Sequence, residues 1–324
     1  MAIGFYVFRD ELAKIGKDDG DKFHVVTAAA INAYSAPFYV AQNMGFWEKE
    51  GLTVEDKYFT SGRLALDALL AGGADLITVA ETPIVFAAFS GQNVGIVATI
   101  SSATNDLKVL ARRDKGIERP EDLRGKRIGM LFGATSEYYA NLFLQAYGIS
   151  FNDIQRVNLN PADMPLALVK GDIDAYVIWE PFVNNGFRKL GPEKAIRFVK
   201  KDIYTLPFNL AVRKDFAAEQ PDVVVRAIRA LIAADAFIRA NPDVVIPLVA
   251  KKIGMDESML KEIWPDYTFD VSLTMDLMSA LKRQAEWAKS IELVPATSTM
   301  PNFRDFVLPK FLLGIDPQRV SLDP

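Results

Sequence analysis

Small polar side chains and glycine gather in short turns where predicted β-strands lead into predicted helices. The turn residues suited to holding a small solute are Asn32, Tyr34, Ser35, Ser61, Gly62, Arg63, Thr82, Phe132, Gly133, Thr135 and Ser136. Each turn precedes a helix, so unpaired backbone N–H groups and the positive end of the helix dipole point outward there. Such turns can bind a sulfonate, carboxylate or phosphate without arginine, at about 0.3–1 kcal/mol per helix end.

The same residues have a purely structural interpretation. Ser61, Thr135 and Ser136 are good N-cap residues, because their side-chain oxygens accept hydrogen bonds from the first turn of a helix. Gly62 and Gly133 can be required by turn geometry alone. The sequence leaves both interpretations open, and only the meeting of several turns at one place favours binding.

Two glutamates, Glu81 and Glu180, fall in the same kind of turn and argue against a purely anionic ligand. Either carboxylate would repel a nearby sulfonate. It would instead favour an amine, an amidine or an aminopyrimidine edge, because charge-assisted hydrogen bonds are about twice as strong as neutral ones. The alternative is that each glutamate complements the dipole at the start of a proline-containing helix. Arg63 is the nearest candidate anion clamp, although the first helical turn can equally direct it to solvent.

Aromatic residues accompany these turns. Tyr34, Trp179 and Phe208, with Asn209 beside the last of them, are predicted to contact the solute. Flat rings with a few fixed polar groups are how small planar ligands are held. Together with the two carboxylates, these rings move the prediction slightly from nitrate or alkanesulfonate toward an amine-bearing or heteroaromatic solute.

The composition excludes several other kinds of chemistry. The 324 residues include no cysteine and one histidine, His24, so disulfides, thiolate metal sites, cysteine nucleophiles and histidine-rich metal sites are excluded. His24 lies in a predicted strand and is interpreted as a structural or surface residue. We therefore expect no catalytic residue, no metal and no cofactor.

The charge balance argues against a nucleic-acid partner. Lys and Arg number 37 against 41 Asp and Glu, which gives a net charge of −4, and no basic block is present. Phosphate contacts need clustered cations, so nucleic-acid binding is not expected. Half of the chain is apolar (50%), which indicates a globular protein. No apolar run approaches the roughly 20 residues that span a bilayer.

These turns must be positioned by an α/β framework, because short β-rich runs alternate with helical segments. The predicted strands are 23–30, 52–59, 75–79, 94–100, 107–112, 127–131, 154–159, 175–178, 195–199 and 208–212. The predicted helices between them include 35–44, 63–71, 136–147, 163–170 and 182–189. The alternation predicts parallel sheets with crossover helices. After residue 212 the pattern is helical, with helices over 221–240, from Pro242 to a stop at Gly254, and over 273–289.

An internal repeat indicates two similar lobes. Residues 68–75 (ALLAGGAD) resemble residues 167–174 (ALVKGDID). Each segment is the end of a helix, a glycine that stops it and an aspartate that opens a β-run.

Four ordered motifs resemble a known family. The segment 36–52, with APFYVA followed by GFWEKEGL, resembles the opening of periplasmic solute-binding proteins of ABC importers. The branch is the aliphatic sulfonate, taurine, nitrate and thiamine-pyrimidine type. PEDLRGKRIG at 120–129, ALVKGDIDA at 167–175 and WEP at 179–181 agree with it, in the expected order. The similarity runs from about Phe23 to the C-terminus.

The resemblance implies a periplasmic binding protein fold of type II, with two Rossmann-like lobes, crossing hinge strands and C-terminal helices. Lobe 1 would comprise 23–104 plus 209–324, and lobe 2 would comprise 105–208. Residues 1–22 would be an N-terminal stub or linker. Ligands of open α/β sheets lie at the carboxyl ends of the strands, and the lobes would close on a solute by a hinge motion.

The implied function is the capture of a small organic solute, which can be a sulfonate, a taurine-like solute or an amine- or pyrimidine-bearing one. The partners would be this solute and the permease of an ABC transporter. The protein would be a monomer in the periplasm or on the outer face of the cytoplasmic membrane. Residues 3–8 (IGFYVF) are either the tail of a removed signal or anchor, or a short helix packed on the body.

The alternative function is an enzyme on the same bilobed fold. Pyrimidine-forming enzymes of thiamine biosynthesis are similar in fold, but they use pyridoxal phosphate with a cysteine-rich stretch and histidines, which this chain lacks. A futalosine-type enzyme is the other form of this alternative. Formation of a new product from a candidate substrate would favour it.

Overall fold

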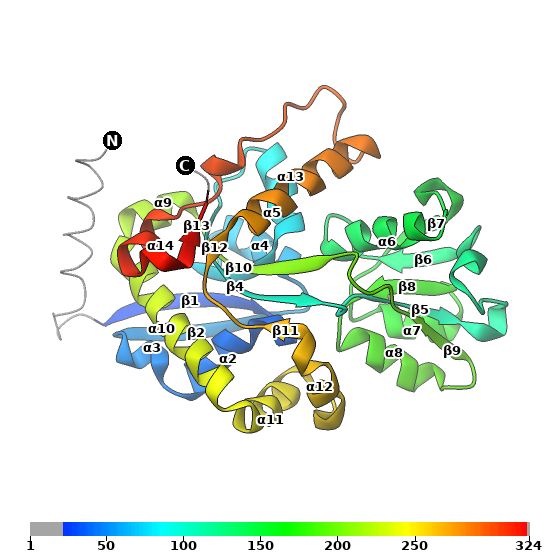
Figure 1. The fold of residues 1–324 in the computed structure, drawn as a ribbon, viewed down its shortest axis with the longest axis horizontal. Helices are drawn as coiled ribbons and strands as arrows, with labels where there is room; N and C mark the ends of the chain where they lie inside the picture. Colours follow the sequence, from blue (N-terminus) through cyan, green and yellow to red (C-terminus); the bar gives the residue numbers. More distant parts are fainter. Residues whose placement is uncertain (1–21, 323–324) are drawn as a thin grey trace. The chain divides into compact units, whose positions relative to one another are not determined.

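The computed structural model describes residues 22–322, so the predicted N-terminal stub lies outside the described residues except for Lys22. Internal contacts divide the chain into two compact units. Of the described residues, unit 1 holds 22–102, 207–249 and 268–322, and unit 2 holds 103–206 and 250–267. The predicted lobe boundaries at 104/105 and 208/209 each lie two residues from these divisions. Strands β4 and β10 carry the chain across them (Figure 1).

Unit 1 is built on a six-stranded sheet with the order β11-β4-β10-β3-β1-β2. The strands are β1 (Phe23–Ala30), β2 (Leu52–Phe59), β3 (Leu76–Ala80), β4 (Gly95–Thr104), β10 (Thr205–Val212) and β11 (Tyr267–Thr268). β1 pairs in parallel with β2 and β3, and β10 pairs antiparallel with β3. A separate two-stranded sheet joins β12 (Leu273–Thr274) to β13 (Val320–Ser321).

Helices cover the sheet of unit 1 and bury its apolar side chains. They are α2 (Ala36–Asn43), α3 (Phe46–Lys49), α4 (Gly62–Leu70), α5 (Glu81–Phe89), α9 (Lys214–Glu219), α10 (Pro221–Ala240), α11 (Pro242–Ile253, which enters unit 2), α13 (Met275–Ser290) and α14 (Lys310–Ile315). α10 packs on α2, α3 and α14, and α13 packs on α5. Val224, Ile228 and Leu231 recur at helical spacing on α10 and are fully buried, as amphipathic periodicity predicts.

Unit 2 has a five-stranded sheet with the order β7-β6-β8-β5-β9. Its strands are β5 (Lys108–Arg112), β6 (Arg127–Met130), β7 (Gln155–Asn158), β8 (Ala175–Ile178) and β9 (Ala195–Phe198). Its helices are α6 (Thr135–Ala146), α7 (Met164–Lys170), α8 (Phe182–Leu190) and α12 (Glu257–Ile263). β6 is parallel to β7 and β8, whereas β5 runs antiparallel to both β8 and β9.

Short 3₁₀ helices complete the connections of both units. They are η1 (Ala33–Ser35), η2 (Arg113–Lys115), η3 (Pro120–Leu123), η4 (Phe151–Asp153), η5 (Trp264–Asp266), η6 (Phe303–Asp305) and η7 (Pro317–Arg319).

The α/β class is confirmed, but the expectation of purely parallel sheets is wrong. β5, β9 and β10 each have an antiparallel partner. Only residues 105–107 separate β5 from β4, which belongs to the other sheet. β5 therefore enters the sheet of unit 2 without a crossover helix, and its direction is opposite to that of β8. The C-terminal third is also not purely helical, because β11, β12 and β13 lie in it.

Residues 250–267, which the sequence assigned to lobe 1, belong to unit 2. The hydroxyl of Tyr267 donates a hydrogen bond to the buried carboxylate of Asp106. Asn105 Nδ2 also donates to Asp266 Oδ1 at 3.5 Å. These contacts join positions 161 residues apart in the chain, so local sequence patterns could not reveal them.

The internal repeat has the same structure in both units. Gly72 and Gly171 follow α4 and α7 with left-handed φ angles of 76° and 81°. Asp75 Oδ2 accepts the backbone N–H of Val26 at 2.9 Å, and Asp174 Oδ2 accepts that of Arg127 at 2.9 Å. Each aspartate therefore ties the start of one strand to its parallel neighbour.

Candidate functional site

The predicted residues of unit 1 lie at one edge of its sheet. β1 and β2 end together because Ala30 pairs with Phe59, and antiparallel β10 places Phe208 opposite Ala80 at the end of β3. This edge therefore carries Asn32, Tyr34, Ser35, Ser61, Gly62, Arg63, Glu81, Thr82, Phe208 and Asn209. It is the carboxyl edge of parallel strands, where open α/β sheets bind ligands.

Several polar side chains of this edge make internal hydrogen bonds. Asn32 caps η1, because its Oδ1 accepts the backbone N–H of Ser35 at 3.2 Å. The Ser35 hydroxyl lies 2.9 Å from that of Thr78. Ser61 caps α4 by accepting the N–H of Leu64 at 3.2 Å. These contacts hold the turns in fixed conformations, which is what a preorganised binding edge requires.

Gly62 is required by a close approach of α4 to β3. A Cβ atom at this position would lie 2.9 Å from Val79 Cα and 3.1 Å from the Thr78 carbonyl oxygen. The neighbouring atoms belong to the backbone of β3 and have no freedom to move aside. Glycine therefore allows the first turn of α4 to start directly against the strand.

An aromatic pair and a buried amide lie together in unit 1. The rings of Tyr34 and Phe208 are 5.1 Å apart at an angle of 32°, and both residues are buried. Asn209 Oδ1 accepts the hydroxyl of Thr99 at 2.8 Å, and its amide donates to the Val79 carbonyl at 3.3 Å. The amide is thus held against the end of β3.

Glu81 begins α5 and is completely buried. Its Oε1 accepts a hydrogen bond from the side-chain amide of Gln284 on α13. Sequence reasoning missed Gln284, which lies 203 residues away and stands in an ordinary helical pattern. Arg63 is 39% exposed, and its Nε lies 3.6 Å from Asp67 Oδ1 one turn along α4.

Unit 2 has a corresponding edge. Phe132, Gly133, Thr135 and Ser136 follow β6, and Trp179 and Glu180 follow β8, which is parallel to β6. The antiparallel β5 brings its first residue, Lys108, opposite Ile178 at the end of β8.

The prediction of available backbone N–H groups is wrong for the first part of the turn after β6. The N–H of Leu131 donates to Ser136 Oγ at 3.0 Å, that of Phe132 to Asn158 Oδ1 at 3.0 Å, and that of Gly133 to Glu137 Oε2 at 2.8 Å. Side chains of the first turn of α6 and of the neighbouring strand β7 supply these acceptors. Thr135 and Ser136 begin α6 and are buried.

Glu180 is an internally paired carboxylate. Its Oε1 lies 3.2 Å from Lys108 Nζ, and its Oε2 accepts the backbone N–H of Asn184 at 2.9 Å. The carboxylate thus occupies the N-terminus of α8, as the helix-dipole interpretation predicts. Lys108 was missed because the parallel pattern placed the start of residues 107–112 at the opposite edge of the sheet.

Buried Asp106 lies next to this pair. Burial raises the pKa of Asp106 to about 6, an effect opposed by the charge of Lys108 and by the hydrogen bond from Tyr267. In the described part of the chain, no group of three or more metal-ligating side chains is present. His24 is exposed on β1. Among residues 22–322, no helix has the length and apolar character needed to cross a bilayer.

Comparison with known proteins decides the family. The family described as NMT1/THI5 like matches residues 32–244, which is more than half of the chain. The chain belongs to the NMT1/THI5-like family. A relative of this family member is the taurine-binding periplasmic protein of Escherichia coli (strain K12). The two are 28% identical over 307 residues, which cover 89% of this chain and 93% of that protein.

Two solved structures share the fold. The periplasmic aliphatic sulphonate binding protein SsuA from Escherichia coli superposes with a TM-score of 0.71 at 21% identity, covering 88% of this chain and 97% of that one. The desulfurization enzyme DSZB has a TM-score of 0.62 at 15% identity, covering 92% of this chain and all of that one (100%). The periplasmic binding protein fold is therefore confirmed, and one protein that shares it is an enzyme.

Proposed function

We propose that this member of the NMT1/THI5-like family is the solute-binding component of an ABC importer and is not an enzyme. Similarity over nearly the whole length to a taurine-binding periplasmic protein carries the proposal. It delivers a small organic solute to a membrane permease from the periplasmic side and acts as a monomer. Each of the edges described above carries residues suited to holding a small solute.

The solute is proposed to be a small sulfonate, with taurine among the candidates. The sequence raised one objection, namely repulsion by Glu81 and Glu180. Contacts in the structure weaken it, because the amide of Gln284 donates to Glu81 and the ammonium of Lys108 pairs with Glu180. The two carboxylates are thus bonded within their own units, and neither must find an amine on the solute.

A thermal-shift screen of refolded, ligand-stripped protein tests the proposal. The panel holds taurine, alkanesulfonates, nitrate, aminopyrimidines, amino acids and small amines. A micromolar dissociation constant corresponds to about −8 kcal/mol. A solute at about 100 times that constant stabilises the folded protein by about 2.7 kcal/mol, which raises the melting temperature by several degrees.

The expected result is a shift with sulfonates, followed by titration calorimetry that gives one site per chain. No shift with any solute of the panel would contradict a binding role. The enzyme alternative has its own readout, because incubation with candidate substrates would then yield a new product. A solute that binds and is recovered unchanged supports the carrier over the enzyme.

A further inference from the structure

Lys108 occupies a distinctive position at the edge of the unit 2 sheet. It is the first residue of β5 and stands opposite Ile178, where β8 leads into the turn of Trp179 and Glu180. Its side chain is mostly buried but keeps 12% of its surface exposed. The side chain is therefore largely shielded from water.

The ammonium of Lys108 has donor capacity that residues 22–322 do not use. Its Nζ lies 3.2 Å from Glu180 Oε1 and 3.4 Å from the carbonyl oxygen of Asp106. An ammonium group carries three donors, and in the described part of the chain no third acceptor is present. Glu180 is held from its other side by the N–H of Asn184, so it fixes the position of the ammonium.

Two further donors, on residues that adjoin Glu180 in the chain or bond to it through the backbone, have no acceptor within residues 22–322. They are the indole N–H of Trp179 and the side-chain amide of Asn184, and both side chains are more than nine-tenths buried. Trp179 directly precedes Glu180, and Asn184 bonds to it through its backbone. Buried donors are normally paired, so unused ones indicate an acceptor supplied from outside the chain.

Two carboxylates act on the ammonium of Lys108. Glu180 pairs with it directly, and Asp106 acts on it through space while accepting the hydroxyl of Tyr267. One Asp106 oxygen, Oδ2, has no partner among the described residues. The indole N–H of Trp179 and the side-chain amide of Asn184 are likewise without a partner among the described residues.

We propose that Lys108 is a specificity-determining residue that selects solutes carrying an oxyanion group, and that Glu180 is the positioning residue that holds its ammonium. The inference rests on the proposed solute-binding function. The oxyanion accepts hydrogen bonds from Lys108, with Trp179 and Asn184 as neutral donors beside it. Charge-assisted bonds of this kind favour an anion over an uncharged group of the same shape.

The test compares two probes by titration calorimetry on the full chain. Ethanesulfonate is the anion, and ethyl methyl sulfone is an uncharged analogue of similar size. Lys108→Met is expected to weaken ethanesulfonate binding tenfold or more while changing sulfone binding less than twofold. Lys108→Arg keeps the charge and should retain most of the preference. Lys108→Gln, which keeps a donor toward Glu180, replaces the Met variant if that variant does not fold.

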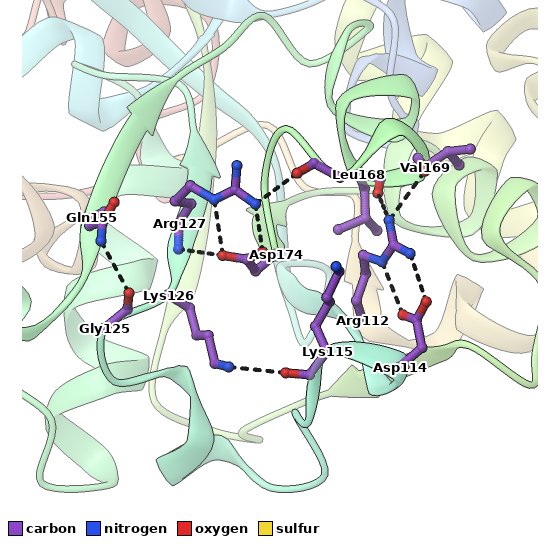
Figure 2. Close-up of polar contacts among 11 residues, drawn as sticks. Arg112, Asp114, Lys115, Gly125, Lys126, Arg127, Gln155, Leu168, Val169 and Asp174 are labelled. Atoms are coloured by element: carbon purple, nitrogen blue, oxygen red, sulfur yellow. Dashed lines mark hydrogen bonds and ion pairs between the residues drawn. The ribbon is translucent and has the colours of Figure 1, made fainter.

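Lys126→Met is the matched control. Lys126 precedes β6 at the opposite end of the same sheet, and within the described part of the chain its Nζ donates only to the Lys115 carbonyl, at 3.0 Å (Figure 2). This variant should bind both probes as the wild type does. Equal losses of both probes in Lys108→Met, or an unchanged preference, would overturn the inference. So would a wild type that binds only uncharged or cationic solutes of the panel. A wild type that binds no solute at all would instead contradict the proposed function.

Discussion

Replacement of Gly62 by alanine tests whether the close approach of α4 to β3 shapes the candidate binding edge of unit 1. The new Cβ would lie 2.9 Å from Val79 Cα and 3.1 Å from the Thr78 carbonyl oxygen. Both are backbone atoms in a fully buried strand, so α4 must move instead. Extra methyl groups in well-packed regions typically cost about 1–3 kcal/mol of folding free energy.

The displacement of α4 should also weaken solute binding. Ser61 caps α4 through Leu64 and stands directly before Gly62, so any movement of the helix displaces this turn. We expect Gly62→Ala to lower both the melting temperature and the affinity for the solute. Differential scanning calorimetry and titration calorimetry on the same preparation measure the two effects.

Gly72→Ala is the matched control at the other end of α4. Gly72 has a φ of +76°, and no atom lies within 4 Å of the position that an added Cβ would take. The substitution therefore strains the backbone by about 1–2 kcal/mol without any clash. It should lower stability and leave solute affinity intact. The reasoning fails if the free energy of unfolding of Gly62→Ala lies within about 0.5 kcal/mol of the wild-type value and the variant binds the solute as tightly as wild type. The close approach would then have no importance for stability or binding.

Three further predictions use contacts within single units. The raised pKa of Asp106, about 6, means that its contribution to stability is complete below the unfolded value of 3.8 and is lost as the pH rises through about 6. The free energy of unfolding should therefore fall less in Asp106→Asn than in wild type when the pH is raised from about 5.5 to about 7.5. Thermal melts at both pH values measure this difference. The same pH dependence in both proteins would contradict the prediction. Asp75→Ala and Asp174→Ala should each cost about 1–3 kcal/mol in denaturant melts, because each removes a charged acceptor of a backbone N–H. If only one of the two variants lost stability, the two aspartates would not have the same structural role. Gln284→Leu should cost about 1–3 kcal/mol, since it removes a donor to fully buried Glu81, whereas an unchanged melt would show that the contact is dispensable.

Asp174 is expected to have the larger effect of the two repeat aspartates. Besides the backbone N–H, its carboxylate accepts the guanidinium of Arg127 at 2.8 and 3.2 Å (Figure 2). Partial burial acts to raise the pKa of Asp174, but these hydrogen bonds outweigh it and hold the pKa below its usual value. Asp75 has no arginine at the matching position, because Val26 stands there.

Local sequence signals predicted most of the framework. The helix predicted over 221–240 is α10 with the same bounds, and the strands predicted over 23–30, 52–59 and 175–178 are β1, β2 and β8. The glycine and aspartate of each repeat were also found from the sequence. These features depend on residues within about a dozen positions of one another, where periodicity, caps and turn residues act directly.

The positions of the predicted strand ends located the candidate site in the sequence, but they did not reveal how its charged groups are paired. The predicted site residues fall at the carboxyl edges of the parallel strands, because strand-to-helix turns must lie there. Phe208 and Asn209 are the exceptions in origin, since antiparallel β10 brings them to that edge. The role of these residues in binding stays a prediction. The partners of the two glutamates were not found, since Gln284 is 203 residues from Glu81 and Lys108 is 72 from Glu180.

The direction of β5, β9 and β10 and the membership of residues 250–267 could not be read from the chain either. A strand has the same alternation of side chains whether its neighbour runs parallel or antiparallel, so pairing direction leaves no local mark. The contact of Tyr267 with Asp106 likewise forms only when distant segments are packed together. Burial then determines which polar groups find partners, and it is this pairing that neutralises Glu180 and leaves the side-chain donors of Trp179 and Asn184 without an acceptor among the described residues.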